Sequence, residues 1–324
     1  MNSRERVLAA LNLQQPDMVP FFDNVDIEMQ RMIIGREDFD QLDFVQEMQF
    51  DAVVYSHFTP PSFVRTETIK GTTRKIQVEG LIKTRKDLKL VQLPVVDDAF
   101  MEGACRFIEK YHKTGKALYF RTRTGSANIL QSMGLDGFSY ALFDDPGLID
   151  TLFDIYTEWI IQVLDRAQTL GFDFAWFADD IAYKNGPMFS PKVFRERFLP
   201  HIRQVVEHIR LPWIYHSDGD LMPLIDDLLS LGMNGLNPIE PIAMDIDQMK
   251  LLYGDRVCLM GNIDLHYTLT LGTVEEVEKE VERRIREIGK GGGFIIASGN
   301  SIPDYCKVEN VLAMRDAVIK YRKY

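Results

Sequence analysis

The sequence predicts a (β/α)8 barrel, the TIM-barrel fold, because eight short apolar runs alternate with helical patterns along 324 residues. Most of these runs are almost continuously apolar, which is typical of parallel strands buried on both faces. A doubly wound open sheet is the alternative, but no G-x-G-x-x-G turn follows the first run. The expected strands are 19–22, 52–55, 117–121, 174–177, 213–215, 235–238, 257–260 and 294–297.

The helices between these runs carry end signals that support the alternation. A long helix is expected to begin at Asp145-Pro146, since proline favours the first helical turn, and to end before Gly171. Thr273 and Glu276 form a capping box ahead of a highly charged helix. Eight strands that alternate with helices make a closed barrel the economical topology.

The segment 60–93 interrupts this alternation. Its Thr- and Val-rich runs around Gly71 and Gly80 predict one or two antiparallel hairpins, inserted after the second strand. Such an insertion would project over the barrel mouth as a lid or a docking surface. The basic stretch 74–89 alternates with apolar residues, so a solvated hairpin is favoured over a binding patch. We expect residues 1–324 to form a single barrel domain that carries this insertion.

Composition and charge narrow the class of protein. The net charge of −11 disfavours nucleic acid as a partner, because phosphate backbones require clustered Lys and Arg. The three cysteines form no CxxC pair, which argues for a reducing compartment. The sequence has no run of about 18 apolar residues, and its first residues resemble an amphipathic helix rather than a signal peptide. We therefore expect a cytoplasmic protein with no membrane partner.

The ends of the predicted strands supply the candidate site residues. In barrel enzymes, catalytic groups come from positions at or just beyond the carboxyl ends of the strands. All eight expected strands end in polar or ionisable residues. In strand order these are Asp23 and Asn24; Ser56 and His57; Arg121 and Arg123; Asp179 and Asp180; His216 and Asp218; Asn237 and Glu240; Asn262 and Asp264; Ser298 and Asn300.

His216 and Asp218 are candidate metal ligands. They lie two residues apart at a strand end, so both side chains can point the same way. With Glu240 from the next strand, one nitrogen and two carboxylate oxygens would converge, and zinc accepts that set with one position open for substrate. In the alternative interpretations, His216 binds Asp218 in a metal-free polar pocket, or both residues are purely structural.

Asp179 and Asp180 are candidate catalytic acids or bases, together with His216. Two adjacent carboxylates on an extended chain point in roughly opposite directions, so only one is expected to face the pocket. The inward carboxylate would transfer a proton, with a pKa raised by burial or by neighbouring carboxylates. The other is expected to cap a helix or to form a salt bridge.

A further set of strand-end residues is expected to contact substrate through aromatic, amide or guanidinium groups. For Asn262, a role in forming a turn is an equally open alternative. The set comprises Tyr215, Asn237, Asn262, Asn300 and Arg121.

Several segments across the chain resemble the uroporphyrinogen decarboxylase superfamily. This resemblance implies a (β/α)8 barrel, in agreement with the strand pattern. True uroporphyrinogen decarboxylases carry an R-Q-A-G-R-Y segment after the first strand, and this chain has 21–26 (FFDNVD) there instead. Without those arginines, a porphyrinogen would lose on the order of 1.5–3 kcal/mol of binding free energy for each missing arginine–carboxylate pair. The matching segments are 4–11, 15–20, 216–220, 237–241, 260–264 and 297–303.

A second branch of this superfamily consists of cobalamin-dependent methyltransferases. Thiol-activating members of that branch hold zinc with a histidine and two cysteines, and the corresponding positions here are His216, Asp218 and Asn300. Both thiolates are thus replaced, which puts a thiol substrate such as coenzyme M in doubt. The chain is more similar to the methyltransferase-one components of O-demethylase systems, whose ligands vary towards carboxylate and histidine.

The resemblance therefore implies a corrinoid-protein-dependent methyltransferase. It would move a methyl group from an O-methyl donor, such as a phenyl methyl ether, to Co(I) of a small partner corrinoid protein docked at the barrel mouth. Zinc is the metal implied. One alternative is a lyase of the uroporphyrinogen decarboxylase type that acts on a smaller carboxylate gripped by Arg121 or Arg123. The other is a non-catalytic corrinoid- or tetrapyrrole-binding protein.

Overall fold

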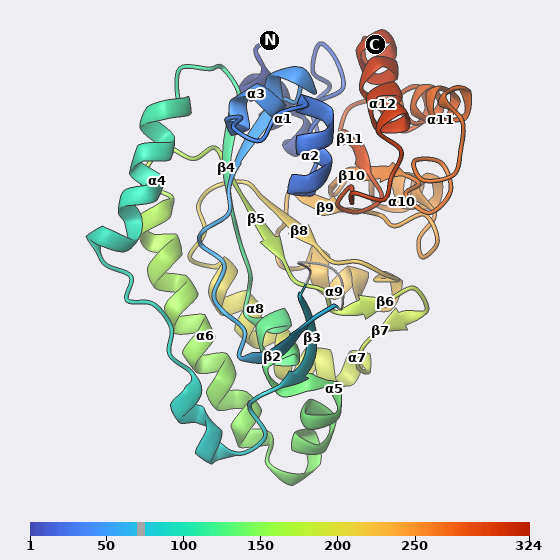
Figure 1. The fold of residues 1–324 in the computed structure, drawn as a ribbon. Helices are drawn as coiled ribbons and strands as arrows, with labels where there is room; N and C mark the ends of the chain where they lie inside the picture. Colours follow the sequence, from blue (N-terminus) through green and yellow to red (C-terminus); the bar gives the residue numbers. More distant parts are fainter. Residues whose placement is uncertain (70–74) are drawn as a thin grey trace.

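The computed structural model describes residues 1–69 and 75–324. Its central element is a seven-stranded parallel sheet with the strand order β1-β4-β5-β8-β9-β10-β11, and helices cover the outside of this sheet (Figure 1). The TIM-barrel prediction is confirmed, and seven of the expected strands appear close to their predicted bounds. These strands are β1 (Ala52–Tyr55), β4 (Ala117–Thr122), β5 (Phe174–Ala178), β8 (Trp213–His216), β9 (Gly235–Asn237), β10 (Cys258–Ile263) and β11 (Phe294–Ser298).

The eighth predicted strand, 19–22, is present only as an extended segment that closes the ring. The N–H of Ile296 in β11 donates to the carbonyl of Pro20 at 3.0 Å, and the N–H of Asp51 before β1 donates to the carbonyl of Phe21 at 2.7 Å. Phe21 and Ile296 form a parallel bridge. Because proline has no N–H to donate, Pro20 interrupts the ladder and the segment does not become a full strand.

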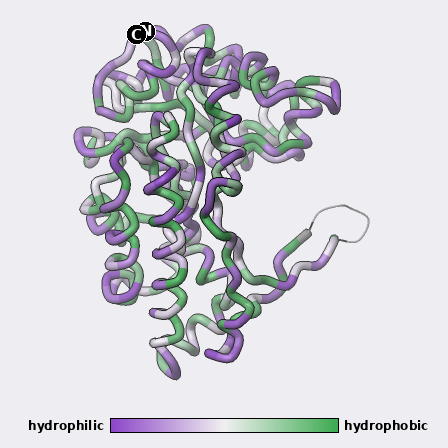
Figure 2. The backbone as a smooth tube through the Cα atoms, turned by 90° about the vertical axis from the view of Figure 1, so that its left-hand side faces the viewer, coloured by the Kyte–Doolittle hydropathy of each residue, from purple (hydrophilic) through white to green (hydrophobic). Residues whose placement is uncertain are grey.

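Asp51 fixes this closing segment to both ends of the chain. Its side chain is 1% exposed and accepts the N–H of Phe21 at 2.9 Å. It also accepts hydrogen bonds from Arg6 at 2.9 Å and Arg322 at 3.3 Å. Arg6 lies in the first helix and Arg322 follows the last one, so a single buried carboxylate joins the two termini, which lie close together in Figures 1 and 2.

The helices begin and end as the sequence signals predicted. Pro146 occupies the first turn of α6, and Gly171 adopts a positive φ of 110° shortly after that helix ends. The Thr273–Glu276 capping box is present at the start of α11. The helices are α1 (Ser3–Leu11), α2 (Ile27–Ile34), α3 (Gln41–Glu47), α4 (Asp98–Tyr111), α5 (Ser126–Asp144), α6 (Pro146–Ala167), α7 (Pro191–Val193), α8 (Leu199–Val206), α9 (Ile225–Leu229), α10 (Ile246–Tyr253), α11 (Val274–Glu287) and α12 (Val308–Tyr321).

Aromatic side chains fill the interior of the barrel. The rings of Tyr119 and Phe174 stack with their centroids 4.6 Å apart, and Trp176 stacks on Tyr119 at 5.7 Å. Phe22 of the closing segment packs against all three rings. Trp176 also approaches the ring of His216 at 5.9 Å, so this stack extends to the strand end that carries the candidate metal ligand.

The predicted insertion is an antiparallel hairpin of β2 (Val64–Thr68) and β3 (Lys75–Gly80). It stands away from the body as an arm (Figure 2). Its base is held against α5, where the N–H of Ile82 donates to the carbonyl of Ser132 at 2.8 Å. A Cβ at Gly80 would meet the backbone of 132–134 at 2.5 Å, so this contact requires glycine. Gly71 and the first residue of the basic stretch, Arg74, lie outside the described residues.

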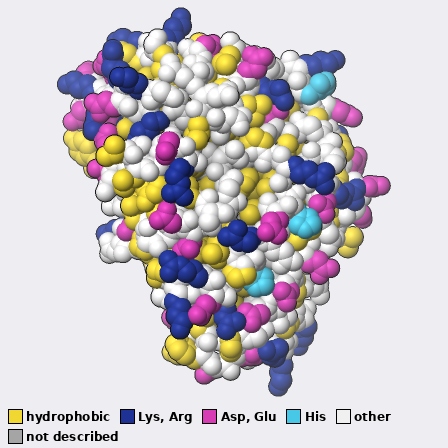
Figure 3. All heavy atoms as spheres, turned by 180° about the vertical axis from the view of Figure 1, so that it is seen from behind, with side chains coloured by type: hydrophobic (Ala, Val, Ile, Leu, Met, Phe, Trp, Pro, Cys, Tyr) yellow, Lys and Arg dark blue, Asp and Glu magenta, His cyan; other side chains and the backbone are white. Residues whose placement is uncertain are grey.

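The surface mixes the two signs of charge, and Figure 3 shows basic and acidic side chains interspersed on the rear face. Cys105, Cys258 and Cys306 are all free thiols. Among the helices of the described part of the chain, none combines the length and the apolar character needed to cross a membrane.

We expect the substitution Asp51→Ala to destabilise the protein by about 3–5 kcal/mol, because it leaves the buried N–H of Phe21 without an acceptor and removes the buried one of the two carboxylates that pair with Arg6. The midpoint of urea unfolding, followed by circular dichroism, measures this loss. Glu102→Ala is the control, since Glu102 pairs with Arg106 on the exposed surface of α4, where such pairs contribute little. Equal midpoints for the two variants would contradict the role given to Asp51.

Candidate metal centre at the barrel mouth

Three side chains from neighbouring strand ends converge at the barrel mouth. Asp180, His216 and Asp218 each offer one ligand atom, and these three atoms lie within 4.8 Å of one another. The Nε2 atom of His216 is 3.6 Å from Oδ1 of Asp180 and 3.7 Å from Oδ1 of Asp218. The side chain of His216 is 11% exposed, whereas those of Asp218 and Asp180 are 32% and 45% exposed. The cluster is therefore buried on the histidine side and open on the Asp180 side.

Asn237 fixes the orientation of the His216 ring. The Nδ2 group of Asn237 donates to the carbonyl of Met260 at 3.2 Å, so its Oδ1 atom is the acceptor that faces His216. The Nδ1 atom of His216 lies 2.5 Å from that oxygen and therefore carries the proton. The lone pair of Nε2 is then directed at the two carboxylates, which is the state in which histidine binds a metal.

Asp218 contributes a carboxylate oxygen without a hydrogen-bond partner to this group. Its Oδ2 atom accepts a hydrogen bond from Asn300 at 2.7 Å, but its Oδ1 atom is buried with no hydrogen-bond partner in the described structure. Burial raises the pKa of Asp218, with Asp180 and Glu240 acting in the same direction against His216 and Asn300. A divalent cation between the three atoms would satisfy the unpartnered oxygen, and one histidine with two carboxylates fits zinc. Without a metal, a proton on Nε2 would take that place.

Asp179 and Asp180 have separate positions, as the alternation of an extended chain predicted. Asp179 is fully buried and points away from the cluster. Its Oδ1 atom accepts the N–H of Ala127 at 2.8 Å and its Oδ2 atom accepts the N–H of Thr124, so it caps the start of α5. Burial raises its pKa, and these two hydrogen bonds oppose that rise. Of the two carboxylates, Asp180 belongs to the converging group, and Asp179 takes the capping position that was expected for the other member of the pair.

Glu240 lies beside the cluster rather than in it. Its Oε2 atom accepts the N–H of Gly219 at 2.9 Å, and its Oε1 atom is 3.8 Å from Nε2 of His266. Because the backbone of the 216–219 turn holds this carboxylate, the ligand group that the structure brings together contains Asp180 in place of Glu240.

The predicted substrate contacts divide into two groups. Asn237 and Asn300 bind the side chains of the cluster, as described above. Tyr215 is completely buried and precedes His216 in β8, so it points to the face of the strand opposite to His216 and away from the cluster. Asn262 is also buried, and its Nδ2 group donates to the carbonyl of Ile239 at 2.9 Å, which joins two strand-end loops.

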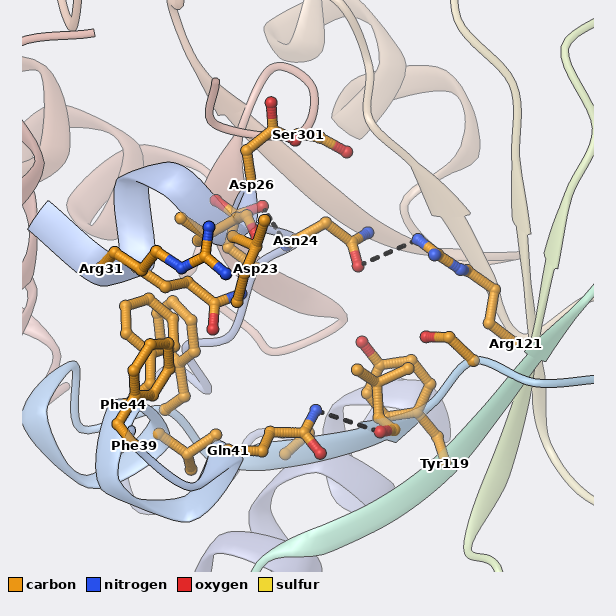
Figure 4. Close-up of a pocket in the computed structure, with 18 of the residues that line it drawn as sticks. Asp23, Asn24, Asp26, Arg31, Phe39, Gln41, Phe44, Tyr119, Arg121 and Ser301 are labelled. Carbon is orange, nitrogen blue, oxygen red and sulfur yellow. Dashed lines mark hydrogen bonds between the residues drawn. The ribbon is translucent and has the colours of Figure 1, made fainter. Parts of the chain in front are cut away.

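Arg121 lines a cavity of about 500 Å³ on the other side of the mouth (Figure 4). Asp23 lies in the same cavity and accepts the N–H groups of Ser298 at 2.6 Å and Asn24 at 2.8 Å. Burial raises the pKa of Asp23 to about 7. Its place after the closing segment marked Asp23 as a strand-end candidate, but no sequence pattern indicated that the pKa of this carboxyl would be raised.

We expect the substitution Asp180→Asn to weaken Zn²⁺ binding far more than Glu240→Gln does, because only Asp180 belongs to the converging group. Asn237→Ala is expected to lower the affinity about 10- to 100-fold, since it frees the His216 ring. Isothermal titration of the metal-stripped protein with Zn²⁺ compares the variants. If Glu240→Gln lost affinity and Asp180→Asn kept it, the ligand set with Glu240 would be the correct one.

Comparisons with known proteins agree with the barrel fold. The family model described as uroporphyrinogen decarboxylase (URO-D) matches residues 124–321, which is more than half of the chain. A methylcobamide:CoM methyltransferase, MtaA, from Methanosarcina barkeri is 26% identical over 174 residues, which cover 54% of this chain and 49% of that protein. The matched region thus spans about half the length of that relative.

Two further relatives cover more of the chain. A uroporphyrinogen decarboxylase from Coxiella burnetii is 24% identical over 267 residues, which cover 74% of this chain and 68% of that protein. The solved structure of a methyltransferase from Methanosarcina mazei superposes with a TM-score of 0.78 at 18% identity, covering 99% of both chains. The predicted resemblance is confirmed, and the chain belongs to the uroporphyrinogen decarboxylase family.

Proposed function

We propose that this protein is a corrinoid-protein-dependent methyltransferase that removes a methyl group from an O-methyl donor. The observation that carries this proposal is the oxygen-rich group of Asp180, His216 and Asp218 at the mouth of a barrel of this family. The similarity to a methylcobamide:CoM methyltransferase supports the methyltransferase branch. Since Asp218 and Asn300 stand where a thiol-activating site would have cysteines, the site suits an oxygen leaving group better than a thiol.

The reaction requires charge stabilisation more than a protein nucleophile. The methyl carbon would move to Co(I) of the partner protein, while the ether oxygen keeps the electron pair of the broken C–O bond. That oxygen leaves as an alkoxide or phenoxide, whose negative charge must be neutralised. In the metal-bound protein, Zn²⁺ held by Asp180, His216 and Asp218 would supply that positive charge.

The surrounding residues would hold this group in the geometry that the reaction needs. Asn237 keeps the lone pair of His216 directed at the mouth, and Asn300 holds one oxygen of Asp218 so that the other stays free. Asp180, the most exposed member, lies where a substrate oxygen and the corrinoid of a docked partner would enter. Asp179 directly precedes Asp180 and accepts the N–H of Ala127. This hydrogen bond would anchor the segment to the start of α5 and so set the position of Asp180.

A lyase that acts on a smaller carboxylate is the second candidate, and Arg121 in the mouth cavity favours it. The related Arg123 is turned away from this role, because its guanidinium donates to Gln131 at 3.0 Å. The two candidate functions make different products. Release of carbon dioxide without any corrinoid would support the lyase, whereas methylation of a corrinoid acceptor would support the methyltransferase.

The test is methyl transfer from a panel of O-methyl donors to a reduced corrinoid acceptor, followed by the absorption change of the corrinoid. We expect His216→Ala and Asp218→Asn to slow this transfer by about 10²-fold or more, because each removes part of the charge stabilisation. His208→Ala is the matched control, since His208 lies on the surface beside Asp165, away from the strand ends. Full activity in both site variants would overturn the assignment of the site.

A further inference from the structure

The hairpin arm, formed by β2 (Val64–Thr68) and β3 (Lys75–Gly80), has a strand edge that nothing pairs with. β2 and β3 form a two-stranded sheet, and no third strand joins it in the described part of the chain. β3 is the strand that contacts α5, where the Nε2 group of Gln77 donates to the carbonyl of Gln131 at 2.9 Å. Among the residues described, no backbone group of β2 forms a backbone hydrogen bond outside the hairpin. The outer edge of β2 is therefore available to another strand.

An available edge of this kind is a binding surface. The side chains of 65–68 are all exposed, and the apolar side chains of Ile76 and Val78 on β3 are 47% and 39% exposed. The arm stands away from the body, so a second molecule has access to β2 (Figure 2). A row of unpaired N–H and carbonyl groups accepts an added strand, and a two-stranded hairpin is only marginally stable by itself. Pairing at this edge would therefore stabilise the arm.

The charges on β2 indicate which strand fits this edge. Arg65 and Glu67 lie on one face of the strand, where Nη1 of Arg65 donates to Oε1 of Glu67 at 2.7 Å. They stand one residue before and one residue after Thr66. When two copies of β2 pair antiparallel about a two-fold axis at Thr66, Arg65 of each copy lies opposite Glu67 of the other. The outer strand is thus complementary in charge to its own copy.

The position of the two-fold axis decides whether the charges attract or repel. An axis at Arg65 would place two arginines opposite each other, and an axis at Glu67 would do the same with two glutamates. Like charges directly opposite each other destabilise a pair of strands, whereas unlike charges and Thr–Thr pairs stabilise it. Thr66 is therefore the central residue that brings unlike charges together.

We propose that the arm is a dimerisation element, in which the β2 strands of two copies of this chain pair antiparallel about Thr66. The product is a four-stranded sheet with the strand order β3-β2-β2-β3. This interface closes after two copies, because pairing uses the same edge of both. The inference does not depend on the proposed methyl transfer, since no residue of the metal group takes part.

Sedimentation velocity of the full chain, measured over a range of concentrations, tests this pairing. We expect the wild-type chain to form dimers. Arg65→Glu leaves only acidic charges at positions 65 and 67, and Glu67→Arg leaves only basic ones, so each variant alone should dimerise about 10-fold or more weakly. In an equimolar mixture of the two variants every opposite pair is again unlike, so heterodimers should form with nearly the wild-type affinity.

The mixture also shows that the arm of each variant is folded, because an unfolded arm could not pair. Arg106→Glu and Glu102→Arg are the matched controls, since they make the same charge changes on the exposed surface of α4 and should each dimerise like the wild-type chain. A wild-type chain that stays monomeric up to about 100 µM, as it would if the edge receives a different protein, would overturn the inference. Arm variants that dimerise alone as well as the wild-type chain, or a mixture that stays monomeric, would overturn it too.

Discussion

Closure of the barrel depends on the carboxylate of Asp51, because the closing segment 19–22 forms too few backbone hydrogen bonds to be held by the sheet alone. Pro20 prevents 19–22 from forming a full ladder, so Asp51 supplies the missing acceptor to Phe21 and ties it to Arg6 and Arg322. The consequence reaches the mouth. Asp23 follows this segment directly, and it meets the N–H of Ser298, 275 residues later in the chain, only because the ring is closed.

The candidate metal centre lies at the carboxyl ends of neighbouring strands of the same barrel. Three acceptor atoms from β5 and β8 and their following turns face one another. Two of the residues are held in place by hydrogen bonds, since His216 donates to Asn237 and Asp218 accepts from Asn300. Such a concentration of negative charge and lone pairs is unfavourable unless a cation or a proton joins it. The positive charge of Arg121 lies in the neighbouring cavity of the mouth, which Asp23, Asp26 and Glu37 also line.

The sequence predicted the strands well because each one is an apolar run bounded by turn or polar residues, a local property. It also predicted that Asp179 and Asp180 would face opposite ways, because alternation is geometric. Which of them faces the mouth depends on where the start of α5 lies, and only the tertiary structure determines that. The same alternation, applied to the residue before His216, would have placed Tyr215 on the buried face.

The position of Glu240 and the raised pKa of Asp23 could not be predicted from the sequence. Glu240 follows its strand by three residues, so its position depends on the path of a loop, and the N–H of Gly219 captures it. The pKa of Asp23 near 7 comes from burial among segments far apart in sequence. No local pattern encodes either outcome, whereas the resemblance to the uroporphyrinogen decarboxylase family pointed to the barrel end where the three potential ligand atoms converge, without fixing the ligand set.

The most direct measurement is the anomalous diffraction of a crystal soaked in Zn²⁺ and recorded on both sides of the zinc absorption edge. A cation site of this chemistry predicts one strong peak at about 2.0–2.2 Å from Nε2 of His216 and from one oxygen each of Asp180 and Asp218. A peak between Glu240 and His266 instead, or no peak in crystals of active protein, would contradict the assignment of this group as the metal centre.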